Sequence, residues 1–234
     1  KSTSEVRKFA LYSIGNGSWK APIIDENPHN FGSIDISSNG EYIVAGEDHG
    51  HDSKIYFFDT DLGSVSGWIY QTNHTVISVS ISADGEYIVA GSGLHWVDDG
   101  NSVYLFNMNM QLIWEYNTGD AVSSVAISSN GEYITAGTRD GTIYLFNKDS
   151  SSPLWNYTTN YYVEDEDFRR INSVAISANG EYIVAGSDDT RVYFFHKQNS
   201  TPLWDHQTNG YVYHVDLSDD GEYIIAGGHA SHAH

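Results

Sequence analysis

A Gly-Glu-Tyr tripeptide that recurs five times, each time at a predicted tight turn, predicts an all-β fold: a five-bladed β-propeller of four-stranded antiparallel blades. The tripeptide begins at Gly40, Gly85, Gly131, Gly180 and Gly221, so successive repeats lie 41 to 49 residues apart. A period of this length, filled with short strand-like runs, is typical of a propeller with one blade per repeat. We therefore expect residues 1–234 to form a single domain.

Each full repeat contains four runs with the composition of strands, and the third repeat shows them clearly. β-Branched and aromatic residues dominate 124–128, 133–137 and 142–147, and a fourth run surrounds Trp155. The first two runs are joined by Asn130-Gly131, and every repeat has Asn-Gly or Asp-Gly at this point. These pairs predict two-residue type I′ hairpins, which need positive φ at both central residues. The complete repeats are predicted near residues 33–71, 78–117, 124–158 and 173–207.

The fourth run of each repeat carries one tryptophan at a fixed place. A large ring in the same position of every blade suits packing between neighbouring sheets. We therefore predict a structural role in the core for these residues. They are Trp19, Trp68, Trp114, Trp155 and Trp204.

The two ends of the sequence predict how the ring closes. The last repeat contains only its first two strands, near residues 213–228. The segment 6–20 has the pattern of the last two strands, with Trp19 placed as in the other repeats. The sequence therefore predicts a fifth blade made of N- and C-terminal half-blades, which removes the exposed sheet edges. The alternative is a fragment of a longer propeller.

The block 177–189, followed by Val192-Tyr193-Phe194-Phe195, resembles the WD40 repeat family. The Gly-His pair of that family is absent, and its Trp-Asp pair is replaced by pairs such as Phe58-Asp59 and Phe146-Asn147. The Pro-Leu-Trp runs that end at Trp155 and Trp204 are more similar to quinoprotein-type repeats. Both resemblances imply a β-propeller, and the WD40 resemblance implies an interaction scaffold. The related quinone-dependent dehydrogenases use eight blades, so five repeats count against that activity.

The net charge bears on the choice of partner. The chain has 11 Lys and Arg residues and 31 Asp and Glu residues, which gives a formal net charge of −20 at pH 7. Binding to nucleic acid depends on cationic side chains, so we expect no nucleic-acid partner. No apolar run approaches the length of a membrane span, and the chain contains no cysteine. Four Asn-x-Ser/Thr sequons weakly favour an extracellular or cell-surface location.

In an antiparallel blade, the turns between the second and third strands and the connections to the next blade share one end. These segments differ between repeats, whereas the Asn-Gly and Asp-Gly turns at the other end are nearly identical, so we expect function at the variable end. Histidine and carboxylate side chains gather there, a combination that suits zinc, copper or nickel, with calcium as a further alternative. The predicted metal ligands are His49, His51, Asp48, Asp52, His95, His229, His232 and His234.

Aromatic residues at the same end predict a face for a protein partner or a sugar. The predicted contact residues are Trp96, Tyr161, Tyr162, Tyr211, Tyr213 and His214. No nucleophile stands beside a base at a recognisable spacing, so we expect no enzymatic activity. The sequence thus predicts a non-enzymatic scaffold that binds a protein partner through an acidic, His- and Tyr-rich face. The alternatives are an extracellular propeller that binds a divalent metal or sugar, and a five-bladed glycosidase-like enzyme.

Overall fold

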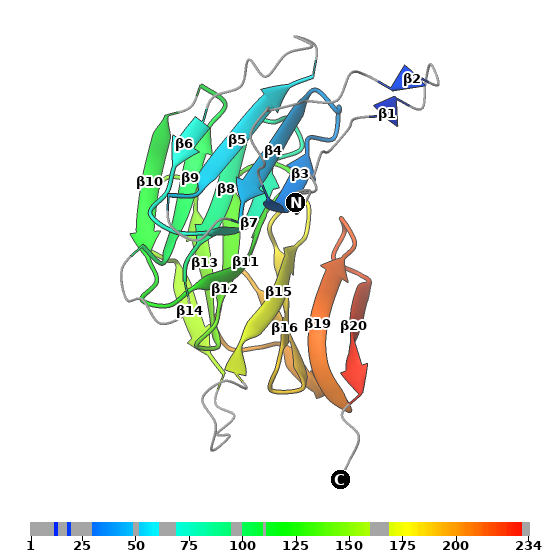
Figure 1. Ribbon diagram of the computed structural model, residues 1–234. Helices are drawn as coiled ribbons and strands as arrows, with labels where there is room; N and C mark the ends of the chain where they lie inside the picture. The colour runs from blue at the N-terminus through cyan, green and yellow to red at the C-terminus, as the bar shows by residue number, and fades with distance from the viewer. Residues whose placement is uncertain are drawn as a thin grey trace, which may run out of the picture.

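The computed structural model describes residues 12–13, 18–19, 30–48, 52–60, 69–94, 100–109, 111–159 and 169–230, and these residues form β-sheets joined by turns (Figure 1). Four sheets have four antiparallel strands each, and we call them blades one to four. Blade one comprises β3 (Phe31–Ile36), β4 (Tyr42–Glu47), β5 (Lys54–Asp59) and β6 (Ile69–Gln71). Blade two comprises β7 (Val76–Ile81), β8 (Tyr87–Ser92), β9 (Ser102–Asn107) and β10 (Leu112–Asn117).

Blades three and four repeat this order. Blade three comprises β11 (Val122–Ile127), β12 (Tyr133–Thr138), β13 (Thr142–Asn147) and β14 (Trp155–Thr158). Blade four comprises β15 (Ile171–Ile176), β16 (Tyr182–Ser187), β17 (Arg191–His196) and β18 (Trp204–Gln207). The hairpin of β19 (Gly210–Leu217) and β20 (Ile224–Ala230), which we call blade five, contains two strands. Five successive sheets agree with a five-bladed β-propeller.

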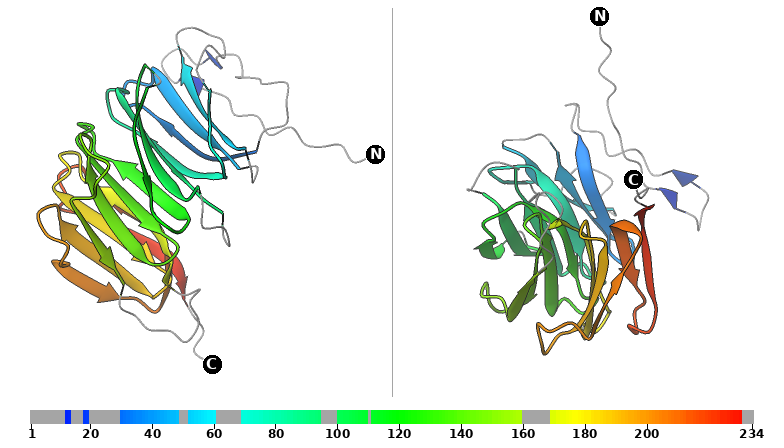
Figure 2. Two further views of the ribbon diagram at one scale, coloured as in Figure 1. Left: turned by 90° about the vertical axis from the view of Figure 1, so that its left-hand side faces the viewer. Right: turned by 90° about the horizontal axis from the view of Figure 1, so that it is seen from below.

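The first strands of the blades lie innermost. Strands β3, β7, β11, β15 and β19 each contact the next in this series. The remaining strands of each blade follow outward in sequence order, and the sheets succeed one another around an arc (Figure 2). Each first strand carries a register shift after its first residues, as between Val122 and Ser124. Thr138, the last residue of the second strand, therefore pairs with Val122, which lies before this bulge.

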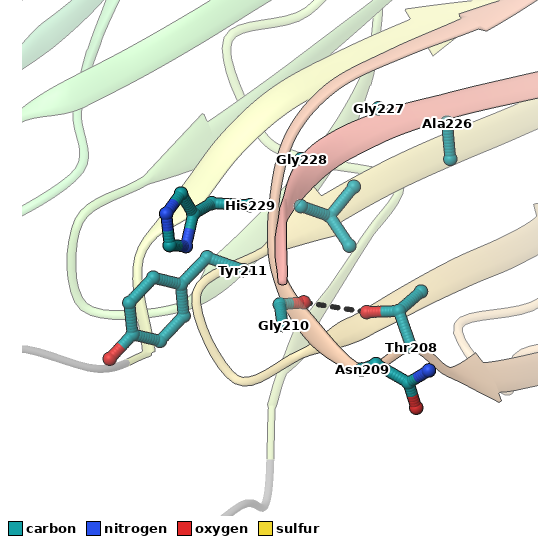
Figure 3. A pocket seen from close by; sticks show the side chains of 9 residues that line it. Thr208, Asn209, Gly210, Tyr211, Ala226, Gly227, Gly228 and His229 are labelled. Carbon is teal, nitrogen blue, oxygen red and sulfur yellow. Dashed lines mark hydrogen bonds between the residues drawn. The ribbon is translucent and has the colours of Figure 1, made fainter. Parts of the chain in front are cut away.

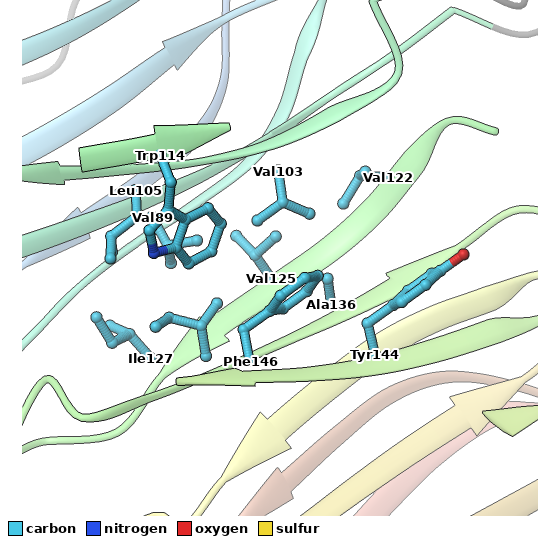
Figure 4. Close-up of a cluster of buried hydrophobic side chains, with 11 residues drawn as sticks. Val89, Val103, Leu105, Trp114, Val122, Val125, Ile127, Ala136, Tyr144 and Phe146 are labelled. Carbon is cyan, nitrogen blue, oxygen red and sulfur yellow. The ribbon is translucent and has the colours of Figure 1, made fainter. Parts of the chain in front are cut away.

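The hydrophobic core lies between neighbouring sheets. Between blades two and three, Val89, Leu105 and Trp114 pack against Val125 and Ile127 (Figure 4). The indole of Trp114 also donates a hydrogen bond to the backbone oxygen of Lys148 in blade three, at 2.9 Å. Burial of side chains of this size stabilises each seam by several kcal/mol, at about 25 cal/mol per Å² of apolar surface.

The prediction of a core tryptophan in each blade is confirmed best by Trp114 and is wrong for Trp204. Trp114 is 8% exposed, and Trp155 is half-buried with its indole donating to the Lys197 oxygen at 2.8 Å. Trp204 is 42% exposed, because β19 and β20 provide no third strand to cover it. The side chains of Trp19 and Trp68 lie outside the described residues.

The hairpins between the first and second strands are confirmed, but the predicted turn type is wrong. Among the turn residues, the glycine alone has a positive φ, for example 70° at Gly131, and Asn130 does not. The Gly131 amide donates a hydrogen bond to the Ser128 backbone oxygen, and the Ser128 amide donates one to the Tyr133 backbone oxygen. Asn130 instead accepts hydrogen bonds from Ser128 Oγ and the Glu132 amide through its side chain. The local side-chain bonds of Asn therefore replace the second positive φ.

The fifth blade is not joined to the N-terminal strands. β1 (Tyr12–Ser13) and β2 (Ser18–Trp19) pair antiparallel with each other, whereas β19 pairs with β20 in a separate sheet. Among the described residues these two pairs form separate sheets, so the four-stranded closing blade and the closure of the ring stay predictions. Figure 1 shows β1 and β2 at the upper right, well above β19 and β20. In the described part of the chain, no helix is long and apolar enough to cross a membrane.

Candidate functional site

The two ends of the blades differ in how regular they are. At one end, the turns between the first and second strands repeat one hydrogen-bond pattern, with Ser128 and Asn130 replaced by Ser177 and Asn179 in the next blade. The other end carries the turns between the second and third strands and the connections between blades. We call it the variable end. The connections differ in length by about eight residues in the sequence.

A repeated threonine fixes the backbone at the variable end. Thr208 Oγ1 donates to the backbone oxygen of Gly210 at 2.6 Å and of Thr190 at 2.9 Å. Thr72 and Thr118 make the same pair of contacts in blades one and two. Each of them lies at the end of the outermost strand and ties the connection to the next blade to the turn between the second and third strands of its own blade. Sequence reasoning missed this device, although a threonine follows the fourth strand of every complete repeat.

A pocket of about 190 Å³ opens beside the Thr208 clamp, where blade four leads into blade five (Figure 3). Its walls come from the connection 208–210, the start of β19, and the glycine-rich end of β20. Gly227 and Gly228 have no side chains, so their backbone borders the pocket directly. The pocket therefore combines a fixed loop with accessible peptide groups.

Two of the predicted residues, Tyr211 and His229, meet at this pocket. They are register partners across β19 and β20, and Figure 3 shows their rings beside each other at one side of the pocket. The Tyr211 and Tyr213 rings are tilted by 47°, with centroids 6.4 Å apart. Tyr213 is 42% exposed. His214 is exposed on β19 opposite Gly227. The structure thus brings together four of the predicted residues on one hairpin.

The other predicted contact residues are Trp96, Tyr161 and Tyr162, and they lie outside the described residues. The same holds for the predicted metal ligands His49, His51, His95, His232 and His234. Their assignments stay predictions.

Two predicted metal ligands of blade one are described. Asp48 is exposed, and its amide donates to the Asn30 oxygen. Asp52 is exposed with φ at 60°, and its carboxylate accepts a hydrogen bond from Gln71 Nε2 at 3.0 Å. Within the described ranges, no three His, Asp or Glu side chains converge on one point as a metal-binding group.

Sequence reasoning also missed a buried carboxylate, Asp189, in the turn of blade four between β16 and β17. Asp189 is 1% exposed. Its carboxylate accepts hydrogen bonds from Tyr193 Oη at 2.5 Å and from the Arg191 amide at 3.0 Å. Burial raises the pKa of Asp189, and these hydrogen bonds oppose that rise. Its contacts lie within its own blade, so we assign it to the scaffold that supports the variable end.

The family comparison identifies the repeats. A model described as WD domain, G-beta repeat matches residues 110–147 and 161–196. At these two segments the chain is similar to the WD40 repeat. No curated protein matches the sequence. The first WD40 match begins beside β10 of blade two and ends with β13 of blade three. This match therefore spans parts of two blades, whereas the described strands of the second match, β15, β16 and β17, belong to blade four alone.

The WD40 match confirms the resemblance deduced from the sequence. WD40 propellers are typically protein-interaction scaffolds without enzymatic activity, and the match suggests that role here. It leaves the partner and the binding face to be inferred from the geometry of the variable end.

Proposed function

We propose that this protein is a non-enzymatic WD40-like propeller that binds a protein partner through the acidic, Tyr- and His-containing face at its variable end. The observation that carries the proposal is the pocket lined by Tyr211, His229 and the bare backbone of Gly227 and Gly228. Aromatic anchors beside a pocket on a rigid scaffold are the usual centres of protein interfaces. The threonine clamp holds this surface in place, which lowers the entropy lost on binding.

The charge of the protein indicates a basic segment as the partner. The formal charge is −20. Described acidic side chains at the variable end include Asp48 and Asp52 of blade one and Asp120 and Asp140 near blade three, all exposed or half-buried. Such a field attracts cationic partners, speeds their association and weakens with salt. We therefore infer a partner segment that pairs Lys or Arg with an apolar or aromatic anchor for the pocket.

We further propose that residues 1–234 act as one domain in which segment 6–20 supplies the outer half of the fifth blade. The antiparallel pairing of β1 with β2 supports this assignment, because the third and fourth strands of every other blade pair in the same way. The exposure of Trp204 supports it as well, since added strands would cover this ring.

The test selects ligands from a display library of Lys- and Arg-rich peptides containing one aromatic residue, and measures the affinity of the best peptide by fluorescence anisotropy. We expect Tyr211→Ala to weaken binding by about tenfold or more, as truncation of an anchor residue does. His229→Ala should weaken it as well. Gln198→Ala, an exposed substitution at the opposite end of blade four, is the matched control and should leave the affinity unchanged.

The salt dependence of the affinity is a second part of this test. Affinity should fall as NaCl rises from 50 to 500 mM, because attraction between exposed charges is screened. Selection of no peptide, or equal affinity for wild-type protein and Tyr211→Ala, would contradict the proposed face.

A further inference from the structure

We propose that the junction between blades three and four, at the variable end, binds a phosphate group. Three of the five arginines in the chain occupy this junction, although the formal net charge of the protein is −20. They come from the turn between β12 and β13 and from the connection that leads into β15. The site is separate from the pocket beside Tyr211, so this inference does not rest on the proposed partner. The residues that supply its hydrogen-bond donors are Arg139, Arg169, Arg170 and Thr159.

The fold places Arg139 and Arg170 in neighbouring positions, as the preceding seam shows. Between blades two and three, a Cβ placed on Gly93 would lie 2.7 Å from Cβ of Ala121. Arg139 holds the place of Gly93 in blade three, because each follows the second strand and its amide donates to the residue before the first strand of its own blade. Arg170 holds the place of Ala121 in blade four, since its oxygen accepts from the Asp188 amide in the same way, at 2.9 Å. Two cationic side chains therefore adjoin across the seam, an arrangement that an anion between them stabilises.

Gly141 brings Arg169 and Thr159 to the same junction. A Cβ placed on Gly141 would lie 3.0 Å from Cβ of Arg169 and 2.6 Å from Oγ1 of Thr159. Gly141 belongs to the same turn as Arg139. The backbone oxygen of Arg169 accepts a hydrogen bond from Ser187 Oγ at 3.2 Å, which ties this segment to blade four. The four proposed residues therefore meet where the two blades adjoin.

Two donors at the junction are buried without a partner. In the described part of the chain, neither Nε of Arg170 nor the hydroxyl of Thr159 makes a hydrogen bond. Thr159 is 2% exposed. The corresponding hydroxyls of Thr72, Thr118 and Thr208 each donate to two backbone oxygens. A buried donor without an acceptor is costly, so two of them at one junction indicate a ligand that supplies the acceptors.

The described carboxylates near the junction have other partners. Asp140 accepts hydrogen bonds from a hydroxyl and an amide of its own turn. Asp188 accepts a hydrogen bond from Nδ2 of Asn172 at 2.6 Å. Among the described residues, neither Arg169 nor Arg170 forms an ion pair. The positive charge of these two guanidinium groups is therefore available to an anion.

The donors suit a phosphate group better than a single carboxylate. A guanidinium group presents its N–H donors in a planar fork that matches the oxygens of an oxyanion. A phosphate monoester carries a charge of about −1.5 to −2 at neutral pH and has three strong acceptor oxygens. This charge balances several guanidinium groups more fully than the single charge of a carboxylate. Free phosphate and a phosphorylated side chain of a partner present the same group, and the experiment separates these two sources.

The experiment titrates the full chain with sodium phosphate at pH 7.5 by isothermal titration calorimetry, with NaCl adjusted to hold the ionic strength constant. We expect a dissociation constant of about 1 mM or lower. Arg170→Gln should weaken binding by about tenfold or more, because it removes charge-assisted hydrogen bonds. Lys54→Gln is the matched control, since it removes one positive charge from a half-buried side chain at the variable end of blade one. It should change the affinity by less than about twofold.

Further ligands identify the source of the phosphate group. A phosphoserine peptide that binds more tightly than inorganic phosphate supports a phosphorylated partner, and one that does not supports free phosphate; both results support the site. Sodium acetate should bind about tenfold more weakly than phosphate. The proposal fails if phosphate does not bind, if acetate binds as tightly, or if Arg170→Gln and Lys54→Gln have equal effects.

A second pair of variants separates ligand binding by Thr159 from a structural role. Thr159→Val removes the hydroxyl and keeps the shape of the side chain. It should weaken phosphate binding severalfold and, without phosphate, shift the melting temperature by less than about 1 °C. Thr118→Val removes a hydroxyl that has two acceptors, so it should lower the melting temperature by about 2–4 °C. A destabilised Thr159→Val with unchanged phosphate affinity would show a purely structural hydroxyl and overturn the proposed site.

Discussion

Asp189 illustrates how a single residue of this protein couples burial to charge. It lies in a turn of blade four, where a carboxylate would ordinarily be solvated, yet it is 1% exposed. The hydroxyl of Tyr193 and the amide of Arg191 replace water as its hydrogen-bond donors. Burial still raises the pKa of Asp189, and burial together with the Asp189 carboxylate raises the pKa of Tyr193. The next residue, Thr190, has φ at 71°, a strained value for a β-branched side chain. This turn therefore contains local features that are individually unfavourable and are held by the packing around them.

Substitution of Asp189→Asn should change how stability depends on pH. The raised pKa means that the native state holds the proton more tightly than the unfolded chain. The free energy of unfolding therefore falls as pH rises from about 4, the ordinary aspartate value, through the raised native value. Asparagine cannot ionise, so the variant should lack this fall. Urea unfolding of both proteins between pH 4 and 7 measures it, and parallel curves for the two proteins would refute the expectation.

The hairpin between the first and second strands is the element that recurs most faithfully. In blade three, Ser128 Oγ accepts from the Tyr133 amide at 3.0 Å and donates to Asn130 Oδ1 at 2.7 Å. The same two contacts recur at Ser37, Ser82, Ser177 and Ser218. The serine therefore organises the turn together with the Asn or Asp that follows it.

Ser128→Ala should destabilise the protein by about 1–2 kcal/mol, because a buried amide and a side-chain acceptor lose their partner. Ser129→Ala is the matched control, since Ser129 is exposed and its backbone oxygen accepts a hydrogen bond from the Ala83 amide of blade two, a contact that alanine retains. Its effect should stay within about 0.5 kcal/mol. Denaturant unfolding distinguishes the two, and a pair of equal effects would argue against the role given to the Ser128 hydroxyl.

At the scale of the whole molecule, stability depends on the seams between sheets more than on any one blade. Four of the five described core clusters combine residues of adjacent blades, such as Trp114 of blade two with Phe146 of blade three, whose ring centroids are 5.3 Å apart. Blade five contributes two strands, and among the described residues no further sheet packs against its outward face. The completeness of the ring therefore decides how much of this apolar surface is covered.

Two glycine substitutions compare the open array with the closed ring. Gly40 and Gly131 have nearly the same φ, 72° and 70°, but Tyr87 packs against Gly131, whereas no described residue packs against Gly40. In a closed ring Tyr223 would lie over Gly40, so Gly40→Ala should destabilise the protein as much as Gly131→Ala, by about 2–3 kcal/mol. An open array leaves only the backbone strain at Gly40, about 1 kcal/mol. Chemical denaturation of both variants decides between these outcomes.

The sequence by itself determined the repeats, the strand order within them and the hairpins, because period, strand composition and turn residues are local signals. It also placed Tyr211, Tyr213, His214 and His229 at one end, since an antiparallel blade sorts its loops by their order along the chain. The prediction of a type I′ turn at Asn130-Gly131 was wrong, because the side-chain hydrogen bonds of Ser128 and Asn130 compete with the preference of this pair for two positive φ angles.

Only the tertiary structure decided which of these residues meet and which remain uncovered. The pocket beside Tyr211 and His229 depends on the pairing register of β19 with β20 and on the Thr208 clamp, and neither can be deduced from spacing. The burial of Asp189 depends on the folding of its own blade, and the exposure of Trp204 depends on which strands of the next sheet cover it. Such contacts join residues far apart in the chain, and their energies arise from packing between sheets. The repeat pattern therefore determines the strands within each blade, whereas the neighbouring blades determine which of its side chains are buried.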